Sequence, residues 1–236
     1  MPRKLKSLER GQVFTAGGFN WLVIERNQEG TLVLMETCLK NAPFDEDDSN
    51  DWRQSSSRRY LNENFLQALE DNGLDPDDII ETEVDLTADD GLKDYGTSRD
   101  KVFLLTADMY RKNRDVIEPI DDWWWLITPY STPTAGYAHD VRLVYSVGSL
   151  ADSYASYGNG GLRPALTLKS DLLVSIEEDH EYAEVDETTA AGIELTADYC
   201  VRLVKSAGII IEIITEQLIS MVANAAKEKG GDEWRN

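Results

Sequence analysis

The stretch DDWWWLITPYSTP, residues 121–133, places three tryptophans in a row before a polar segment that contains two prolines. Successive side chains of an extended chain point to opposite faces, so at least one of Trp124 and Trp125 must enter the core beside Leu126. Each indole buries a large area and needs a partner for its N–H group. We therefore expect Trp124 and Trp125 to be core residues and Trp123 to lie at the surface.

The segment that follows, residues 130–159, is rich in tyrosine, serine, glycine and asparagine. Binding loops favour these residue types because they provide contact area and adaptable hydrogen bonds at little cost in side-chain entropy. The alternative is that they are ordinary turn and strand residues. The candidate ligand-binding residues are Tyr130, Tyr137, His139, Asp140, Arg142, Tyr145, Tyr154, Tyr157 and Asn159.

The sequence before the tryptophans predicts a β-hairpin and then a helix. Residues 20–25 and 31–37 are rich in β-branched and aromatic side chains, and Gly30 lies in the turn between them. In residues 55–72 apolar side chains recur every three or four positions, which predicts an amphipathic helix. We also expect a buried strand at 100–106, a short helix at 107–113, β-ribbons within 130–161 and a closing strand at 162–168.

Several motifs occur in a fixed order along this part of the chain. They are GGFNWLVI (17–24), WRQSSSRRYLNENF (52–65), DKVFLLT (100–106), WWLITP (124–129) and GLRPALTL (161–168). In these motifs the chain resembles a C-type-lectin-like domain of uncharacterised bacterial and phage proteins, related to variable ligand-binding proteins of phages. Ile127 and Ser57 depart from the pattern, which has an arginine and an aliphatic residue at these positions.

The resemblance implies an α+β, C-type-lectin-like fold for residues 1–175, with no catalytic activity. It also implies a ligand-binding or structural role, such as a capsid decoration, tail fibre or receptor-binding component of a phage virion. The core residues that the motifs imply are Trp21, Trp52, Arg58, Leu61, Asn62, Phe65, Trp124, Trp125 and Arg163.

The C-terminal quarter differs in character from the rest. Residues 176–195 are acidic and predict an exposed linker. Residues 196–236 follow with an apolar stripe at heptad-like spacing, which predicts a helical extension. A strand over 208–215 is the alternative, because isoleucines favour strands and Gly208 interrupts a helix. We expect residues 196–229 to drive homo-oligomerisation or docking onto a larger assembly, since a lone helix with such an apolar face would not stay monomeric.

The charge and the cysteines limit the compartment and the partners. The formal net charge of −21 argues against nucleic acid and anionic membranes as partners. It fits either solubility or binding to a basic partner or to cations. No signal peptide or apolar span is visible, so we expect synthesis in the cytoplasm, a place in a virion and no membrane insertion. Cys38 and Cys200 have apolar neighbours and suggest buried free thiols, with a disulfide as the alternative.

The motifs of common enzymes are missing. The two histidines, His139 and His180, are far apart and form no metal-binding spacing, and neither a GxSxG elbow nor a Walker loop occurs. The acidic stretch DLTADDGLKD (85–94) does not match an EF-hand loop, because Leu86 falls at its first ligand position. We therefore expect no metal or other cofactor and no catalysis. The predicted function is binding of a cell-surface glycan or protein, and the alternatives are a purely structural virion protein or a bacterial binding protein.

Overall fold

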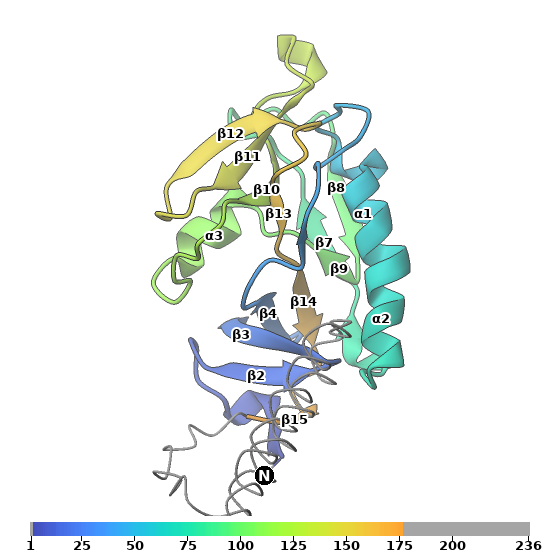
Figure 1. The fold of residues 1–236 in the computed structure, drawn as a ribbon, viewed down its shortest axis with the longest axis vertical. Helices are drawn as coiled ribbons and strands as arrows, with labels where there is room; N and C mark the ends of the chain where they lie inside the picture. The colour runs from blue at the N-terminus through green and yellow to red at the C-terminus, as the bar shows by residue number, and fades with distance from the viewer. Residues whose placement is uncertain (1, 177–236) are drawn as a thin grey trace, which may run out of the picture. The chain divides into compact units, whose positions relative to one another are not determined.

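Most of the regular structure is β-strand in residues 2–176, the part of the chain that this computed structural model describes (Figure 1). The strands form a six-stranded sheet, a five-stranded sheet and two two-stranded sheets. The two-stranded sheets pair β1 (Arg3–Lys4) with β15 (Leu173–Val174), and β7 (Thr82–Asp85) with β8 (Thr97–Asp100). Short helical turns are η1 (Leu5–Ser7), η2 (Trp52–Gln54), η4 (Pro76–Asp78) and η5 (Pro133–Ala135).

The six-stranded sheet contains the predicted hairpin. Its members are β2 (Val13–Ala16), β3 (Phe19–Arg26), β4 (Thr31–Met35), β14 (Ala165–Leu168), β6 (Ile79–Ile80) and β9 (Val102–Phe103). The predicted closing strand begins after Pro164 as β14 and pairs with β4, β6 and β9. Gly30 is required in the hairpin turn, because a Cβ there would lie 2.6 Å from the carbonyl oxygen of Leu168.

The predicted amphipathic helix is present as one continuous 16-residue segment. It consists of α1 (Ser56–Tyr60), the π-helical turn η3 (Leu61–Phe65) and α2 (Leu66–Asp71). The Ser55 side chain accepts a hydrogen bond from the Arg58 N–H and caps the N-terminus. Leu61, Phe65 and Leu69, four residues apart, are fully buried, so one face of the helix packs on the sheets.

The five-stranded sheet is built around the tryptophan stretch. Its order is β12 (Leu150–Tyr154), β11 (Asp140–Val144), β10 (Trp124–Pro129), β13 (Gly161–Leu162) and β5 (Lys40–Asn41). Every residue of β10 is buried, since β10 is the central strand and has protein on both faces. The short helix α3 (Ala107–Asn113) packs beside β10, and Tyr110 of this helix contacts the Trp124 ring edge-to-face at 5.6 Å.

The buried indoles of Trp21 and Trp125 have hydrogen-bond partners for their N–H groups. The Trp125 indole donates a 3.0 Å hydrogen bond to the Ala42 carbonyl, and the Trp21 indole donates one of 2.9 Å to the Ala16 carbonyl. Trp124 and Trp125 are 1% and 0% exposed, whereas Trp123 is partly exposed. Both tryptophans of β10 therefore fill the interior, one on each face of the sheet.

Asp100 and Arg163 are two of the charged residues that are buried in this scaffold. The Asp100 carboxylate is buried and accepts from the Trp52 indole (2.9 Å), Ser98 Oγ (2.7 Å) and Arg58 Nε (2.7 Å). Arg163 is 2% exposed, donates to the carbonyls of Met35 and Glu36, and has its guanidinium 5.0 Å from the Trp124 ring. Burial lowers the pKa of Arg163 to about 10.

The other residues implied as core are placed as follows. Trp21, Trp52, Leu61 and Phe65 are fully buried. Arg58 and Asn62 are partly exposed on the helix. The Asn62 side chain accepts from the Val102 N–H and donates to the Val102 carbonyl, which joins the helix to β9.

The expected fold class, α+β with a C-type-lectin-like fold, is wrong. The described residues are mostly β, with several sheets in a half-barrel arrangement and one 16-residue helix. A polar segment with a weak sequence pattern accounts for part of the difference, since residues 97–100 form a strand that pairs with 82–85. The pairing of residues 140–144 with 150–154 agrees with the β-ribbons expected within 130–161. The expected linker at 177–195 and the extension at 196–236, with the predicted helix and its strand alternative at 208–215, lie outside the described residues.

Within residues 2–176, no helix combines the length and the apolar character that crossing a bilayer requires.

Candidate functional site

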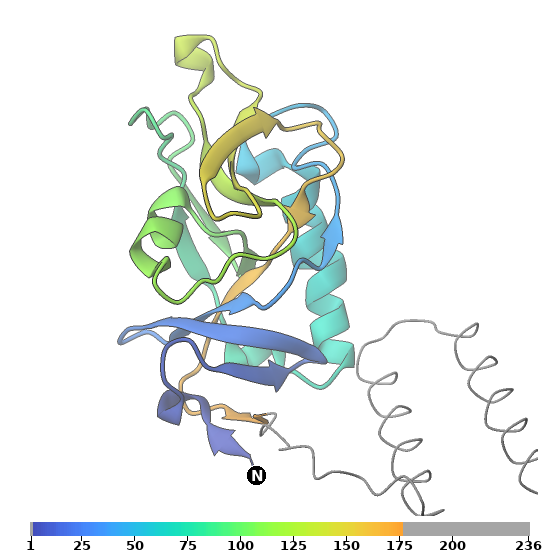
Figure 2. The same cartoon turned by 60° about the vertical axis from the view of Figure 1, so that its left-hand side comes forward.

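The predicted binding segment lies at the surface, next to the buried tryptophans. Tyr130, Tyr137, Tyr145, Tyr154 and Tyr157 are 41%, 50%, 47%, 60% and 52% exposed. The loop that contains η5 is at one end of the described unit, and the N-terminal strand is at the other (Figures 1 and 2). Burying a tyrosine is favourable, so five exposed tyrosines on one segment indicate a candidate contact surface.

Two of these tyrosines line a groove of about 360 Å³ between two loops. One loop, residues 130–139, connects β10 to β11, and the other, residues 86–96, connects β7 to β8. Hydrogen bonds join the two loops: Ser131 Oγ donates to Asp90 (2.5 Å), and Thr134 donates to Asp94 from Oγ1 (2.6 Å) and from its N–H (3.3 Å). The Asp89 N–H also donates to the carbonyl of Pro129 at the end of β10 (2.9 Å). The residues that line the groove are Asp89, Asp90, Tyr130, Ser131, Ala135 and Tyr137.

The two tyrosines form an aromatic wall of the groove. The ring centroids of Tyr130 and Tyr137 are 6.0 Å apart, and the ring planes make an angle of 67°. The guanidinium of Arg142 lies 6.0 Å from the centre of the Tyr130 ring, within the range of a cation–π contact. The rings therefore support each other and still present surface to solvent.

Charged groups surround Asp89 at the base of the groove. The Asp89 carboxylate is 2.8 Å from an Arg111 guanidinium nitrogen and 3.4 Å from Arg142 Nε. Arg142 also donates to Asp152 at 2.9 Å, on the neighbouring strand β12. Arg111 also pairs with Asp108 at 2.7 Å. Hydrogen bonding to Asp89 and Asp108 raises the pKa of Arg111.

Asp90 differs from Asp89 in its partners. Its carboxylate accepts from Ser131 Oγ and from the Leu92 N–H. Among the ion pairs of residues 2–176, none includes Asp90. Asp94, in the same loop, accepts from the Thr134 hydroxyl, and this hydrogen bond lowers the pKa of Asp94. Within residues 2–176, the hydrogen bonds to these two carboxylates at the groove rim therefore come from neutral donors.

Asn50 fixes the shape of the tyrosine loop from inside the protein. It is fully buried, and its amide nitrogen donates to the carbonyls of Ser131 and Asp140, both at 3.0 Å. Its side-chain oxygen accepts from the Tyr95 hydroxyl at 2.6 Å, and its backbone N–H donates to the Ala138 carbonyl at 2.9 Å. Both ends of the loop are thus bonded to one buried residue.

The remaining predicted binding residues are not brought into the groove. His139 lies near Asp48, with 3.8 Å between Nδ1 and the carboxylate. Tyr145 is at the β11–β12 turn, and Tyr154 faces Asp140 at the other end of that hairpin. Burial raises the pKa of the partly exposed Asp140.

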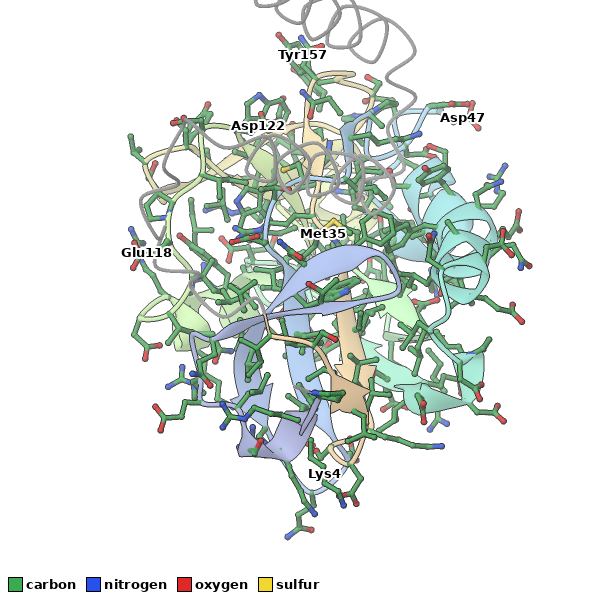
Figure 3. All side chains as sticks on the ribbon, turned by 60° about the horizontal axis from the view of Figure 1, so that its bottom comes forward. Lys4, Met35, Asp47, Glu118, Asp122 and Tyr157 are labelled. Carbon is green, nitrogen blue, oxygen red and sulfur yellow. The ribbon has the colours of Figure 1, made fainter. Side chains whose placement is uncertain are left out.

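Tyr157 contacts Trp123 at 6.0 Å between ring centres, and its side chain points outward from the end opposite Lys4 (Figure 3). Asn159 is exposed beside it. The structure therefore brings together the side chains of Tyr130, Tyr137 and Arg142, and Asp140 adjoins them through its carbonyl, which accepts from the Tyr130 N–H at 2.9 Å.

Half of the groove cannot be recognised from the sequence. Asp89 and Asp90 belong to an acidic stretch that does not match an EF-hand loop, and Ser131 and Ala135 are part of no motif. Residues 2–176 contain no group of three metal-ligating side chains in metal-binding geometry. The sequence does contain an acidic loop that ends in glycine, DLTADDG (85–91), and a tyrosine-containing loop at 130–139. Nothing in the sequence shows that the two loops meet.

Cys38, one of the two predicted free thiols, is partly buried and unpaired. Desolvation raises its pKa to about 12. A thiol needs an accessible, ionised sulfur to act as a nucleophile, so Cys38 is chemically inert at neutral pH.

Comparison with known proteins identifies one family. The model of a family described as a domain of unknown function (DUF6273) matches residues 28–118 and 106–170. Four of the motifs quoted above fall within these ranges, and only the motif at 17–24 precedes them. No curated protein and no solved structure matches the chain. Because the matched ranges cover more than half of its 236 residues, the chain belongs to the DUF6273 family.

Proposed function

We propose that this protein is a non-enzymatic binding module that holds a cell-surface glycan in the groove between residues 86–96 and 130–139. The observation that supports the proposal is the pair of exposed rings, Tyr130 and Tyr137, in a groove with hydrogen-bonding side chains. Flat aromatic faces pack against the C–H face of a sugar ring, and carboxylates and hydroxyls accept or donate bonds to its hydroxyl groups.

The groove is held in a fixed shape, which lowers the entropy lost when a ligand binds. The loops are joined to each other by hydrogen bonds and to the interior through Asn50. All residues of the adjoining strand β10 are buried, and its Trp124 and Trp125 side chains pack in the core. Loops that a rigid scaffold holds in place are common sites of recognition.

A glycan array followed by titration calorimetry tests this proposal. The informative variant is the double change Tyr130→Ala and Tyr137→Ala. The matched control is Tyr145→Ala and Tyr154→Ala, which removes two equally exposed tyrosines from the β11–β12 hairpin. We expect the first variant to lose binding at least tenfold, because buried apolar surface contributes about 25 cal/mol per Å² and a loss of about 60 Å² of ring contact therefore amounts to tenfold. The control should bind like the wild type. Equal binding by all three proteins would remove the groove as the ligand site.

A second candidate is a purely structural role as a component of a phage particle. It is favoured by the apolar stripe in the sequence of residues 196–229. Ile211→Asp with Leu218→Asp in the full chain should then lower the mass that light scattering measures. An unchanged mass would remove self-association through this segment.

A further inference from the structure

The groove has an excess of negative charge. Three carboxylates, those of Asp89, Asp108 and Asp152, pair with two guanidinium groups, those of Arg111 and Arg142, and a fourth, that of the exposed Asp90, accepts from Ser131 Oγ. Both guanidinium groups are shared between two carboxylates each. The unshared negative charge is that of Asp90, which lines the groove and accepts only from a hydroxyl and a backbone N–H.

An ammonium group satisfies this arrangement better than a neutral group does. A charge-assisted hydrogen bond to a carboxylate is about twice as strong as a neutral one. The neighbouring tyrosine rings add attraction, because a cation is stabilised over an aromatic face. The protein already uses this contact, with the Arg142 guanidinium 6.0 Å from the Tyr130 ring. The whole chain adds to the effect with its net charge of −21, which steers cationic ligands toward it.

The aromatic part of the groove sets the shape of the ligand. Tyr130 and Tyr137 present a face and an edge at 67° to each other beside Asp90. A volume of about 360 Å³ is at the small end of ligand sites. One or two pyranose rings fit such a volume, with one ring on tyrosine and one substituent at the carboxylate.

We infer that the groove selects saccharides that carry a free, protonated amino group, with the ammonium at Asp90 and the sugar ring on Tyr130 and Tyr137. The inference rests on the proposed function and specifies its ligand class. It predicts discrimination between an amino sugar and the same sugar with an acetylated amine, because acetylation removes the charge and leaves the ring unchanged.

Calorimetry with two tetrasaccharides tests the inference. One is β-1,4-linked glucosamine and the other is its fully N-acetylated form, both at about pH 6, below the ordinary pKa of an amine. We expect the full-length protein to bind the free-amine form at least tenfold more tightly. This preference should shrink when the salt rises from about 0.05 M to about 0.5 M, since the partly exposed charges are screened.

Two matched variants separate the groove from the general acidity of the chain. Asp90→Asn should abolish the preference for the free amine and leave binding of the acetylated form in place. Asp77→Asn makes the same change at an exposed aspartate in η4 and should keep the preference. A preference that survives Asp90→Asn would overturn the assignment to this carboxylate.

The other outcomes distinguish the inference from the function on which it rests. Equal or tighter binding of the acetylated tetrasaccharide, lost in Tyr130→Ala with Tyr137→Ala, would overturn the amine preference and support glycan binding. No binding of either tetrasaccharide by the wild-type protein would count against both. Near-ultraviolet circular dichroism of each variant shows whether its fold is intact.

Discussion

Replacing Gly160 with alanine should destabilise the fold, whereas the same change at Gly158 should not. A Cβ at position 160 would overlap the indole nitrogen of Trp125 and lie 2.8 Å from Cζ3 of Trp123. A Cβ at position 158 would meet nothing within 4 Å. Neither glycine has a φ in the left-handed region, so the two substitutions differ in packing and not in backbone strain.

The size of the effect follows from how firmly Trp125 is held. The indole is fully buried and bonded to the Ala42 carbonyl, and Phe44 and Trp123 contact its ring edge-to-face at 6.1 and 4.9 Å. An overpacked core costs about 1–3 kcal/mol of unfolding free energy. For a domain of this size, each kcal/mol lowers Tm by about 2–4 °C. We therefore expect Gly160→Ala to lower Tm by about 2–12 °C.

Thermal and urea unfolding followed by tryptophan fluorescence measure this difference. Gly158→Ala should leave the midpoint unchanged or raise it slightly, because alanine restricts the unfolded chain. If Gly160→Ala were as stable as Gly158→Ala, the indole packing around Trp125 would not be as described, and the reasoning would fail.

Three further changes probe other parts of the scaffold. Asp100→Asn removes the negative charge that accepts hydrogen bonds from Arg58, Trp52 and Ser98, and it should lower the unfolding free energy measured in urea by roughly 2 kcal/mol. The control Asp77→Asn should change the unfolding free energy by no more than about 0.5 kcal/mol. Equal effects of the two changes would contradict the stabilising role of the buried Asp100 carboxylate. Asn50→Ala removes the donors to the Ser131 and Asp140 carbonyls, so hydrogen exchange should quicken in residues 130–140 and not in β4; unchanged exchange there would refute the role of Asn50. Cys38 has its pKa raised from 9.0 to about 12, so the folded form keeps a proton that the unfolded form loses, and the Cys38 contribution to stability should fall as pH rises from 9 toward 12. Iodoacetamide at pH 8 should alkylate Cys38 slowly in the folded chain and quickly in urea, and rapid alkylation of the folded chain would disprove its burial.

Local patterns in the sequence predicted several elements well. The hairpin at β3 and β4 follows from β-branched runs around Gly30, and the 56–71 helix follows from its apolar spacing and from Ser55. The predicted burial of Trp124 and Trp125 is also confirmed; alternation in an extended chain requires at least one of them to enter the core, and both do because β10 has protein on each face. These features depend on residues that are close together in the sequence.

Other features depend on contacts between distant residues and could not be predicted. Strands β7 and β8 are polar, at 82–85 and 97–100, and their pairing is visible only when both are placed. The predicted fold class was wrong because it depends on how such short strands pair into sheets. Part of the groove could be predicted, because the composition of residues 130–159 indicates Tyr130 and Tyr137 as binding residues. Asp89 and Asp90 could not be predicted, because they are brought near these tyrosines by hydrogen bonds between distant segments.

The central claim is that ligands bind where the 86–96 and 130–139 loops meet. Amide chemical shifts recorded by NMR during titration with the glucosamine tetrasaccharide test this claim most directly. The account predicts that the largest changes occur at Asp89, Asp90 and residues 130–137, with little change at Tyr145 or Tyr157. Changes centred on Tyr145 or Tyr157 with the groove unaffected would contradict it.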